Sequence, residues 1–217
     1  SIGIVVPELD KYRQTLHKEI FTNLIPQAIF PWEKKETPFD ISIGTPLSNE
    51  NMIQVALDII SISIHKIPIN KILHIINNPY IKCGRTSCIN RNRFEAKLKK
   101  GNMSTLDFEF IKLFNNTEKW PELNELANHA TKLSTLKGVK LPSFWANTFS
   151  EFLKNIGWVA DSDKTISSRE IQCLNTWNEC LDDLASLDTL TQKLSRTNAI
   201  NELKQITSNK LFQVKTK

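Results

Sequence analysis

The sequence predicts a mainly helical protein, in which a helical bundle is attached to a small α/β piece with two parallel strands. Only 6 of the 217 residues are Gly, and long segments repeat apolar residues at steps of three and four, the spacing of one helix face. Two short apolar runs, residues 2–6 and 39–43, are typical of strands, and a helix is predicted after each. This order favours parallel strands joined by a right-handed crossover. Two strands are too few for a stable sheet, so we expect the rest of the sheet outside this chain.

The predicted elements divide the chain into residues 1–64 and residues 65–217. In the first part a helix over 8–24 follows the first strand, and a second helix follows a turn at 44–48. The second part is predicted to contain only helices. We place them at about residues 69–77, 89–100, 105–115, 121–135, 142–156, 167–187 and 196–207.

The helix that begins after Ser167 is the one best specified by its sequence. Ser167 and Glu170 have the spacing of a capping box, in which each side chain accepts a hydrogen bond from the other residue's backbone N–H. An apolar stripe follows, formed by Ile171, Leu174, Trp177, Leu181, Leu184 and Leu187. Because a Trp in such a stripe is usually a core residue, we interpret this helix as the structural centre and look for function elsewhere. Ser104 and Ser143 are also predicted to begin helices, and Gly157 to end one.

Composition and charge indicate a globular protein without a membrane-spanning segment. The chain is 40% hydrophobic and 24% charged, and no apolar run reaches the length of about 18 residues that a membrane helix needs. The four Cys lack regular spacing, which is typical of free thiols in a reducing compartment, and we therefore expect a cytoplasmic protein. The net charge of +5 is local, because residues 82–103 carry seven Lys or Arg against one acid.

No catalytic motif is recognisable, and we predict no catalytic residue, metal ligand or cofactor in this chain. The sequence lacks a phosphate-binding loop, a Gly-rich dinucleotide-binding turn, a zinc-protease H-E-x-x-H and a nucleophile elbow. The four cysteines are Cys83, Cys88, Cys173 and Cys180. Their spacing differs from the short pairs that are common among zinc ligands, so free thiols are the favoured interpretation.

A weaker motif concerns nuclease chemistry. Glu95 and Lys97 match half of a carboxylate–lysine nuclease site, and Asp40 is a distant counterpart. Such a site needs its acids on adjacent strands so that both reach one magnesium ion, whereas Glu95 lies in a predicted helix. A stand-alone nuclease is therefore the least favoured of the functions considered.

The basic segment is the better candidate for function. If residues 89–100 are helical, Arg93, Lys97 and Lys100 lie on one face, while Phe94 and Leu98 form a separate apolar side. This geometry suits contacts with nucleic-acid phosphates, independent of base sequence. The candidate DNA-binding residues are Arg85, Arg91, Arg93, Lys97, Lys99 and Lys100. Two alternatives stay open, a solvated helix face and an interface with an acidic partner.

Several short motifs, in their order along the chain, suggest a family. They are Val5-Val-Pro7, Ser42-Ile-Gly-Thr-Pro-Leu47, Asn78-Pro-Tyr80, Pro142-Ser-Phe-Trp-Ala146, Gly157-Trp158, and Ser168-Arg-Glu-Ile-Gln172 followed by Trp177 and Leu181. With these motifs nearly the whole chain resembles a segment of the bacterial "probable DNA repair protein" family. Members of that family are inactivated superfamily I helicases of the AddB/RexB type, with a RecB-like nuclease at the C-terminal end.

The resemblance implies a role without catalysis. Residues 1–64 would be the start of the second RecA-like helicase domain, and residues 65–217 the helical insertion within it. The nuclease motif would lie downstream of this chain. The expected partners are the DNA backbone, the rest of the parent chain and a helicase–nuclease partner subunit, with no membrane. The alternative function is a helical module that docks a partner subunit without touching DNA.

Overall fold

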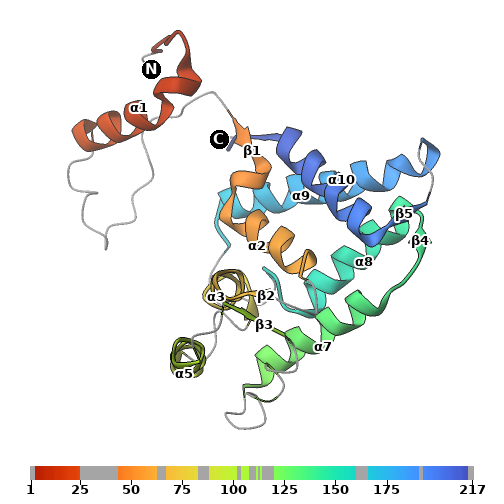
Figure 1. The fold of residues 1–217 in the computed structure, drawn as a ribbon. Helices are drawn as coiled ribbons and strands as arrows, with labels where there is room; N and C mark the ends of the chain where they lie inside the picture. The colour runs from red at the N-terminus through yellow and green to blue at the C-terminus, as the bar shows by residue number, and fades with distance from the viewer. Residues whose placement is uncertain are drawn as a thin grey trace. The chain divides into compact units, whose positions relative to one another are not determined.

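The described part of the protein is mainly helical, as the sequence predicts (Figure 1). The computed structural model describes residues 3–24, 44–62, 67–82, 88–101, 104–107, 111, 113, 120–159, 166–190 and 193–214. It contains two compact units. Unit 1 comprises Ser1–Thr45 and Leu211–Lys217, and unit 2 comprises Pro46–Lys210. Within the described residues, every helix is too short or too polar to cross a membrane. The division into residues 1–64 and 65–217 stays a prediction.

Unit 1 contains the predicted N-terminal helix but lacks the predicted strand before it. Helix α1 (Leu9–Leu24) follows Pro7, and none of its described side chains is buried. The strand prediction over residues 2–6 is wrong for residues 3–6, which form no strand, and Val5 is 95% exposed. An apolar run becomes a strand only beside a neighbour that accepts its hydrogen bonds, and no described strand pairs with it. Residues 39–43 lie outside the described residues, so the parallel strand pair is not confirmed.

From residue 45 onward the helices follow the predicted pattern closely (Figure 1). The α-helices are α2 (Asn51–Ile60), α3 (Ile69–Ile76), α5 (Cys88–Lys100), α7 (Pro121–Thr135), α8 (Pro142–Asn155), α9 (Ser168–Ser186) and α10 (Arg196–Asn209). Within the described residues, η2 (Leu47–Asn49) and η3 (Leu187–Thr189) are short 3-10 helices. Short strands are β1 (Thr45–Pro46), β2 (Ile67–Pro68), β3 (Thr105–Leu106), β4 (Val139–Lys140), β5 (Leu194–Ser195) and β6 (Leu211–Phe212).

The strands pair two by two and join connections that are far apart in the sequence. β1 pairs with β6, β2 pairs antiparallel with β3, and β4 pairs antiparallel with β5. The β2–β3 pair corrects the prediction of a helix over 105–115 at its first two residues, because Leu106 lies opposite Ile67. Ser104 therefore caps no helix there, and its carbonyl accepts a hydrogen bond from the Ile69 N–H at 3.1 Å. A two-residue strand has no periodicity that could be recognised in a sequence.

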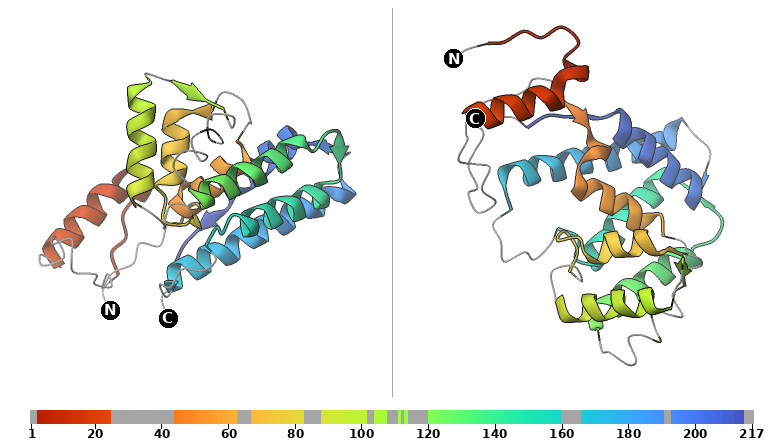
Figure 2. Two further views of the ribbon diagram at one scale, coloured as in Figure 1. Left: turned by 90° about the horizontal axis from the view of Figure 1, so that it is seen from below. Right: turned by 60° about the vertical axis from the view of Figure 1, so that its left-hand side comes forward.

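Helices α8 and α9 run antiparallel and lie side by side in unit 2 (Figure 2). Their ends are joined at Asp188, whose Oδ1 atom accepts a hydrogen bond from the Ser143 N–H at 2.8 Å. Ser143 is the second residue of α8, after Pro142, so its hydroxyl is not the cap that the sequence predicts. The Asp188 carboxylate of η3, which directly follows α9, takes that place. It satisfies a backbone donor without a helical partner, and its charge is favourable at the positive end of the α8 dipole.

The predicted capping box at the start of α9 is confirmed. The Ser167 Oγ atom accepts the Glu170 N–H at 3.2 Å, and Glu170 Oε2 accepts the Ser167 N–H at 2.8 Å. The buried face of the helix consists of Cys173, Trp177, Cys180, Leu181 and Leu184. Ile171, assigned to the apolar stripe from sequence, is 48% exposed. The stripe is rotated toward the two small Cys side chains, which let α9 pack closely against its neighbours.

The end of α8 connects three helices. Gly157 ends α8 with φ +68°, and the backbone bonds from Gly157 N–H to Lys154 C=O and from Trp158 N–H to Leu153 C=O, both 3.0 Å, form a Schellman motif. The buried Trp158 indole then donates to the Met52 carbonyl of α2 at 3.1 Å. Its ring contacts the Trp177 ring of α9 edge to face, with the centroids 5.6 Å apart.

The conformation of Gly157 gives a stability prediction. A Cβ atom at this position would lie 2.9 Å from the Lys82 Cβ atom, and the positive φ is unfavourable for any other residue. We expect Gly157→Ala to lower the free energy of unfolding by about 2 kcal/mol or more, measured by urea unfolding followed through Trp fluorescence. Gly138→Ala is the matched control, because Gly138 has φ +85° with no atom within 4 Å of the added Cβ. Equal losses in the two variants would contradict a role for the Lys82 contact.

Candidate nucleic-acid interface

Helix α5 presents a basic face and is held by an apolar one. Phe94 and Leu98, one helical turn apart, are buried with 0% and 1% exposure. The Phe94 ring contacts the Trp120 ring edge to face at 6.1 Å between centroids, and α5 also contacts α3. The predicted apolar side of this helix is therefore confirmed. Fixing it against α3 and Trp120 determines which side chains of α5 face away from the protein.

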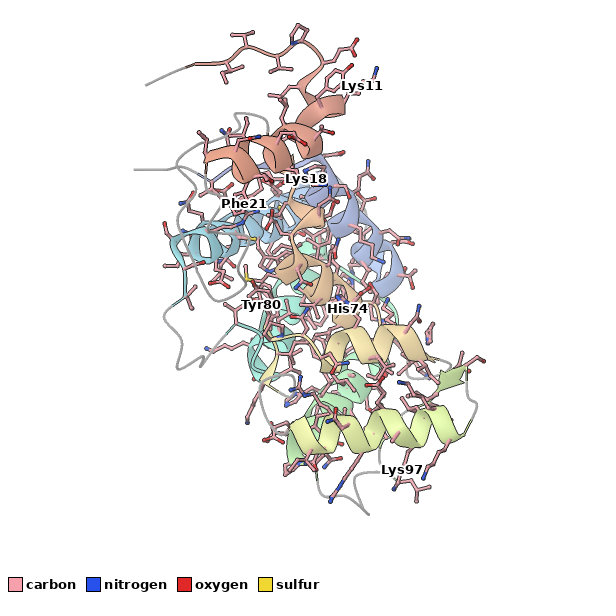
Figure 3. All side chains as sticks on the ribbon, turned by 90° about the vertical axis from the view of Figure 1, so that its left-hand side faces the viewer. Lys11, Lys18, Phe21, His74, Tyr80 and Lys97 are labelled. Atoms are coloured by element: carbon pink, nitrogen blue, oxygen red, sulfur yellow. The ribbon has the colours of Figure 1, made fainter. Side chains whose placement is uncertain are left out.

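The row of cations predicted on this helix is exposed. Arg93, Lys97 and Lys100 lie at steps of four and three on one face, and all three side chains are exposed. Figure 3 labels Lys97 on α5. From Arg93 to Lys100 the helix rises by about 10 Å, roughly the rise of three nucleotides along one DNA strand. Lys97, Lys99 and Lys100 occupy the last turn of α5. Positive charge is favourable there, beside the negative end of the helix dipole.

The other candidates differ in their surroundings. Lys99 is exposed and forms an ion pair with Glu95, one turn earlier, at 2.8 Å. Arg91 is half-buried, because it shares a face with Phe94 and Leu98 at steps of three and four. Arg85 lies outside the described residues. The row formed by Arg93, Lys97 and Lys100, hereafter the α5 row, is thus the part of the candidate set that shares one exposed face.

The weaker sequence motifs include residues outside the described part of the chain. Glu95 is paired with Lys99, while Asp40 and Cys83 lie outside the described part. Cys173 and Cys180 are free and buried, and burial raises the pKa of the Cys173 thiol to about 12 and that of Cys180 to about 11. Among the residues that the structure places, no three His, Cys, Asp or Glu side chains form a group suited to a metal ion.

A cluster that the sequence did not suggest joins α2 to α3. The Asp58 carboxylate of α2 contacts two side chains of α3, Lys71 Nζ at 3.1 Å and His74 Nδ1 at 3.2 Å. Figure 3 labels His74 on α3. All three side chains are partly exposed. The two oxygens of Asp58 each hold one partner, so the carboxylate connects the two helices. The nearby Ser61 hydroxyl donates to the Leu57 carbonyl and is not directed at the imidazole. This cluster is therefore an ion-pair contact and not a nucleophile–base arrangement.

A second cluster holds the Asn78–Tyr80 turn against α9. The Tyr80 hydroxyl donates to Glu170 Oε1 at 3.0 Å, so one carboxylate serves both this turn and the capping box. Asn78, buried at 4% exposure, accepts the Tyr80 N–H at 3.1 Å and donates to Asn51 Oδ1 at 3.0 Å. Arg169, which precedes Glu170 on α9, forms an ion pair with Glu50 at 2.8 Å. These polar groups satisfy one another, as buried polar groups in folded proteins generally do.

Comparisons with models of known protein families, with curated proteins and with solved structures found no match for this chain. The resemblance to the "probable DNA repair protein" family therefore stays a prediction from the motifs. Residues of three of these motifs stabilise local structure in this chain. Asn78 and Tyr80 form the turn against α9, Gly157 and Trp158 end α8, and Glu170 belongs to the capping box.

The Tyr80–Glu170 contact predicts a pH dependence. Burial, together with the hydrogen bond to Glu170, raises the pKa of Tyr80 from 10.0 to about 12. The folded state therefore holds this proton more tightly than the unfolded state. The resulting stabilisation is complete below about pH 10 and is lost as the pH rises toward 12. In a Tyr12→Phe background, which leaves Tyr80 as the only Tyr, we expect tyrosinate absorbance to appear near pH 12.

Glu170→Gln tests the cause, because Gln preserves the capping box but removes the charge. We expect it to lower the pKa of Tyr80 without bringing it to the ordinary value, since burial is the larger cause. Glu151→Gln, an exposed change on α8, is the control and should leave the titration unchanged. Near-ultraviolet circular dichroism at each pH verifies that the protein is folded. A Tyr80 midpoint near pH 10 in the folded protein would contradict the predicted contact.

Proposed function

We propose that this chain is a non-catalytic part of a helicase–nuclease DNA repair and recombination protein, and that it contacts the DNA backbone through α5. The observation that carries the proposal is the α5 row, three exposed cations on a helix whose separate apolar side, Phe94 and Leu98, is buried. Lys and Arg at such positions bind phosphates through charge and do not distinguish bases. The binding would therefore be independent of sequence and would weaken steeply with salt.

Two further observations support a scaffolding role. Motif residues that suggested the family serve here as a turn, a helix end and a helix cap, and these positions stabilise a fold. The ionisable clusters of unit 2 that involve Asp58 and Glu170 are paired internally. In this role the chain would act in the cytoplasm, beside the rest of the parent chain and its partner subunit, and would require no cofactor of its own.

DNA binding can be tested by fluorescence anisotropy with labelled single-stranded and duplex oligonucleotides at several salt concentrations. We expect binding at low salt, and we expect Arg93→Ala/Lys97→Ala to weaken it and to reduce the slope of log K against log salt by about two. All three residues of the α5 row are exposed, so the double variant should retain the stability of the parent protein.

The matched control is Lys132→Ala/Lys154→Ala, which removes the same charge from exposed positions on α7 and α8. This control variant should bind DNA nearly as well as the parent protein. If the chain binds no DNA at low salt, or if the two double variants lose equal affinity, the proposed role of α5 is wrong. Binding of an acidic protein to α5 in place of DNA would support the alternative function of docking a partner subunit.

A further inference from the structure

Two connections between helices meet at one end of unit 2 and form a surface that includes no residue of α5. Strand β4, between α7 and α8, pairs with β5, between α9 and α10, so that Val139 lies opposite Ser195 and Lys140 opposite Leu194. The Trp145 indole donates to the Leu194 carbonyl at 2.8 Å, and Asp188 of η3, directly after α9, caps α8. Figure 1 shows β4 and β5 together on the side of unit 2 away from α5, and Figure 2 agrees.

This end of the unit exposes four apolar side chains from the two connections and the start of α8. The exposed fraction is 54% for Val139, 44% for Leu141, 39% for Phe144 and 80% for Leu190. They come from both connections, which the β4–β5 pair and the Asp188 cap hold together. Single exposed apolar residues are common on protein surfaces, whereas an exposed apolar patch is typical of a binding surface.

The charges on the same surface have one sign. Exposed Lys137 and Lys140 flank Val139, and exposed Lys193 precedes β5. Within the described residues, none of these three ammonium groups forms an ion pair. The described acid of this region is Asp188, and its carboxylate already accepts the Ser143 N–H. We call Lys137, Val139, Lys140, Leu141, Phe144, Leu190, Lys193 and Arg196 the tip surface.

Arg196 adds a further cation directly after β5. It is the first residue of α10, directly after β5, and its side chain is partly buried. One terminal nitrogen, Nη1, is buried and has no hydrogen-bond partner among the described residues. Burial lowers the pKa of this guanidinium below its ordinary value, and no nearby acid counteracts that effect. Because arginine stays protonated in proteins, this guanidinium adds to the positive potential at this end of unit 2, which favours an anionic partner.

From this arrangement we propose that the tip surface binds an acidic segment of a partner protein, in which carboxylates alternate with apolar side chains. The cations match the carboxylates, and the exposed Val, Leu and Phe side chains match the apolar residues of the segment. Single-stranded nucleic acid fits less well, because its bases need exposed aromatic faces on which to stack. Phe144 is the one aromatic residue of the tip surface, and the Lys140 ammonium lies over its ring, 5.7 Å from the centroid.

The test uses the full chain and a short fluorescein-labelled peptide that repeats the tetrad Asp-Leu-Glu-Val. We expect the peptide to bind, and Lys140→Glu/Lys193→Glu to weaken binding about tenfold or more, since each tenfold corresponds to about 1.4 kcal/mol. Val139→Ser/Leu190→Ser should weaken it as well, because the apolar contacts contribute independently of charge. All four side chains are exposed, so circular dichroism should report an unchanged fold.

Matched controls separate the tip surface from general charge. Lys132→Glu/Lys154→Glu makes the same change of charge at exposed positions of α7 and α8 outside the tip and should leave binding of the peptide unchanged. A peptide with Asn and Gln in place of Asp and Glu should not bind. The proposal is overturned if the acidic peptide does not bind, if both charge-reversal variants lose equal affinity, or if the tip variants instead reduce binding to anionic lipid vesicles or single-stranded DNA. Because α5 is not altered, these outcomes are independent of the DNA-binding test.

Discussion

The packing of unit 2 depends on the indole of Trp158. Its N–H donates to the Met52 carbonyl of α2, and its ring lies edge-on to Trp177 of α9, so one side chain from the end of α8 connects three helices. The chain reaches this position only because Gly157 adopts a left-handed conformation that closes the Schellman motif. A buried ring that packs on one side and donates a hydrogen bond on the other fixes both distance and orientation. The α8–α9 pair therefore has one arrangement relative to α2.

Features encoded by neighbouring residues could be predicted from the sequence. The capping box of Ser167 and Glu170, the end of α8 at Gly157 and the apolar side of α5 at Phe94 and Leu98 all depend on residues within two turns of one another. The same holds for the α5 row, because three cations at steps of three and four share a face wherever the segment is helical. This part of the candidate site could therefore be predicted from the sequence alone.

Features that depend on distant residues could not be predicted. Asp188 caps α8 from a position 45 residues further along the chain, and β4 pairs with β5 across the whole of α8 and α9. Ile171 fits the apolar spacing but lies outside the buried face, because the neighbours of α9 accept the side containing Cys173 and Cys180. The strand prediction at residues 3–6 was wrong for the same reason, because no described strand forms hydrogen bonds with this apolar run. Spacing indicates that a face exists, and only the surrounding helices decide whether it is covered.

The two cysteines of α9 have a practical consequence. Cys173 and Cys180 are buried seven residues apart on the face that packs into unit 2, and neither thiol ionises readily near neutral pH. A thiol reagent reacts with the thiolate and needs direct access to the sulfur, so it can modify these residues only while α9 is transiently detached. In a variant that retains only these two cysteines, the rate of labelling would report how often the centre of the bundle opens. The helix thus carries its own internal probe of conformational fluctuation.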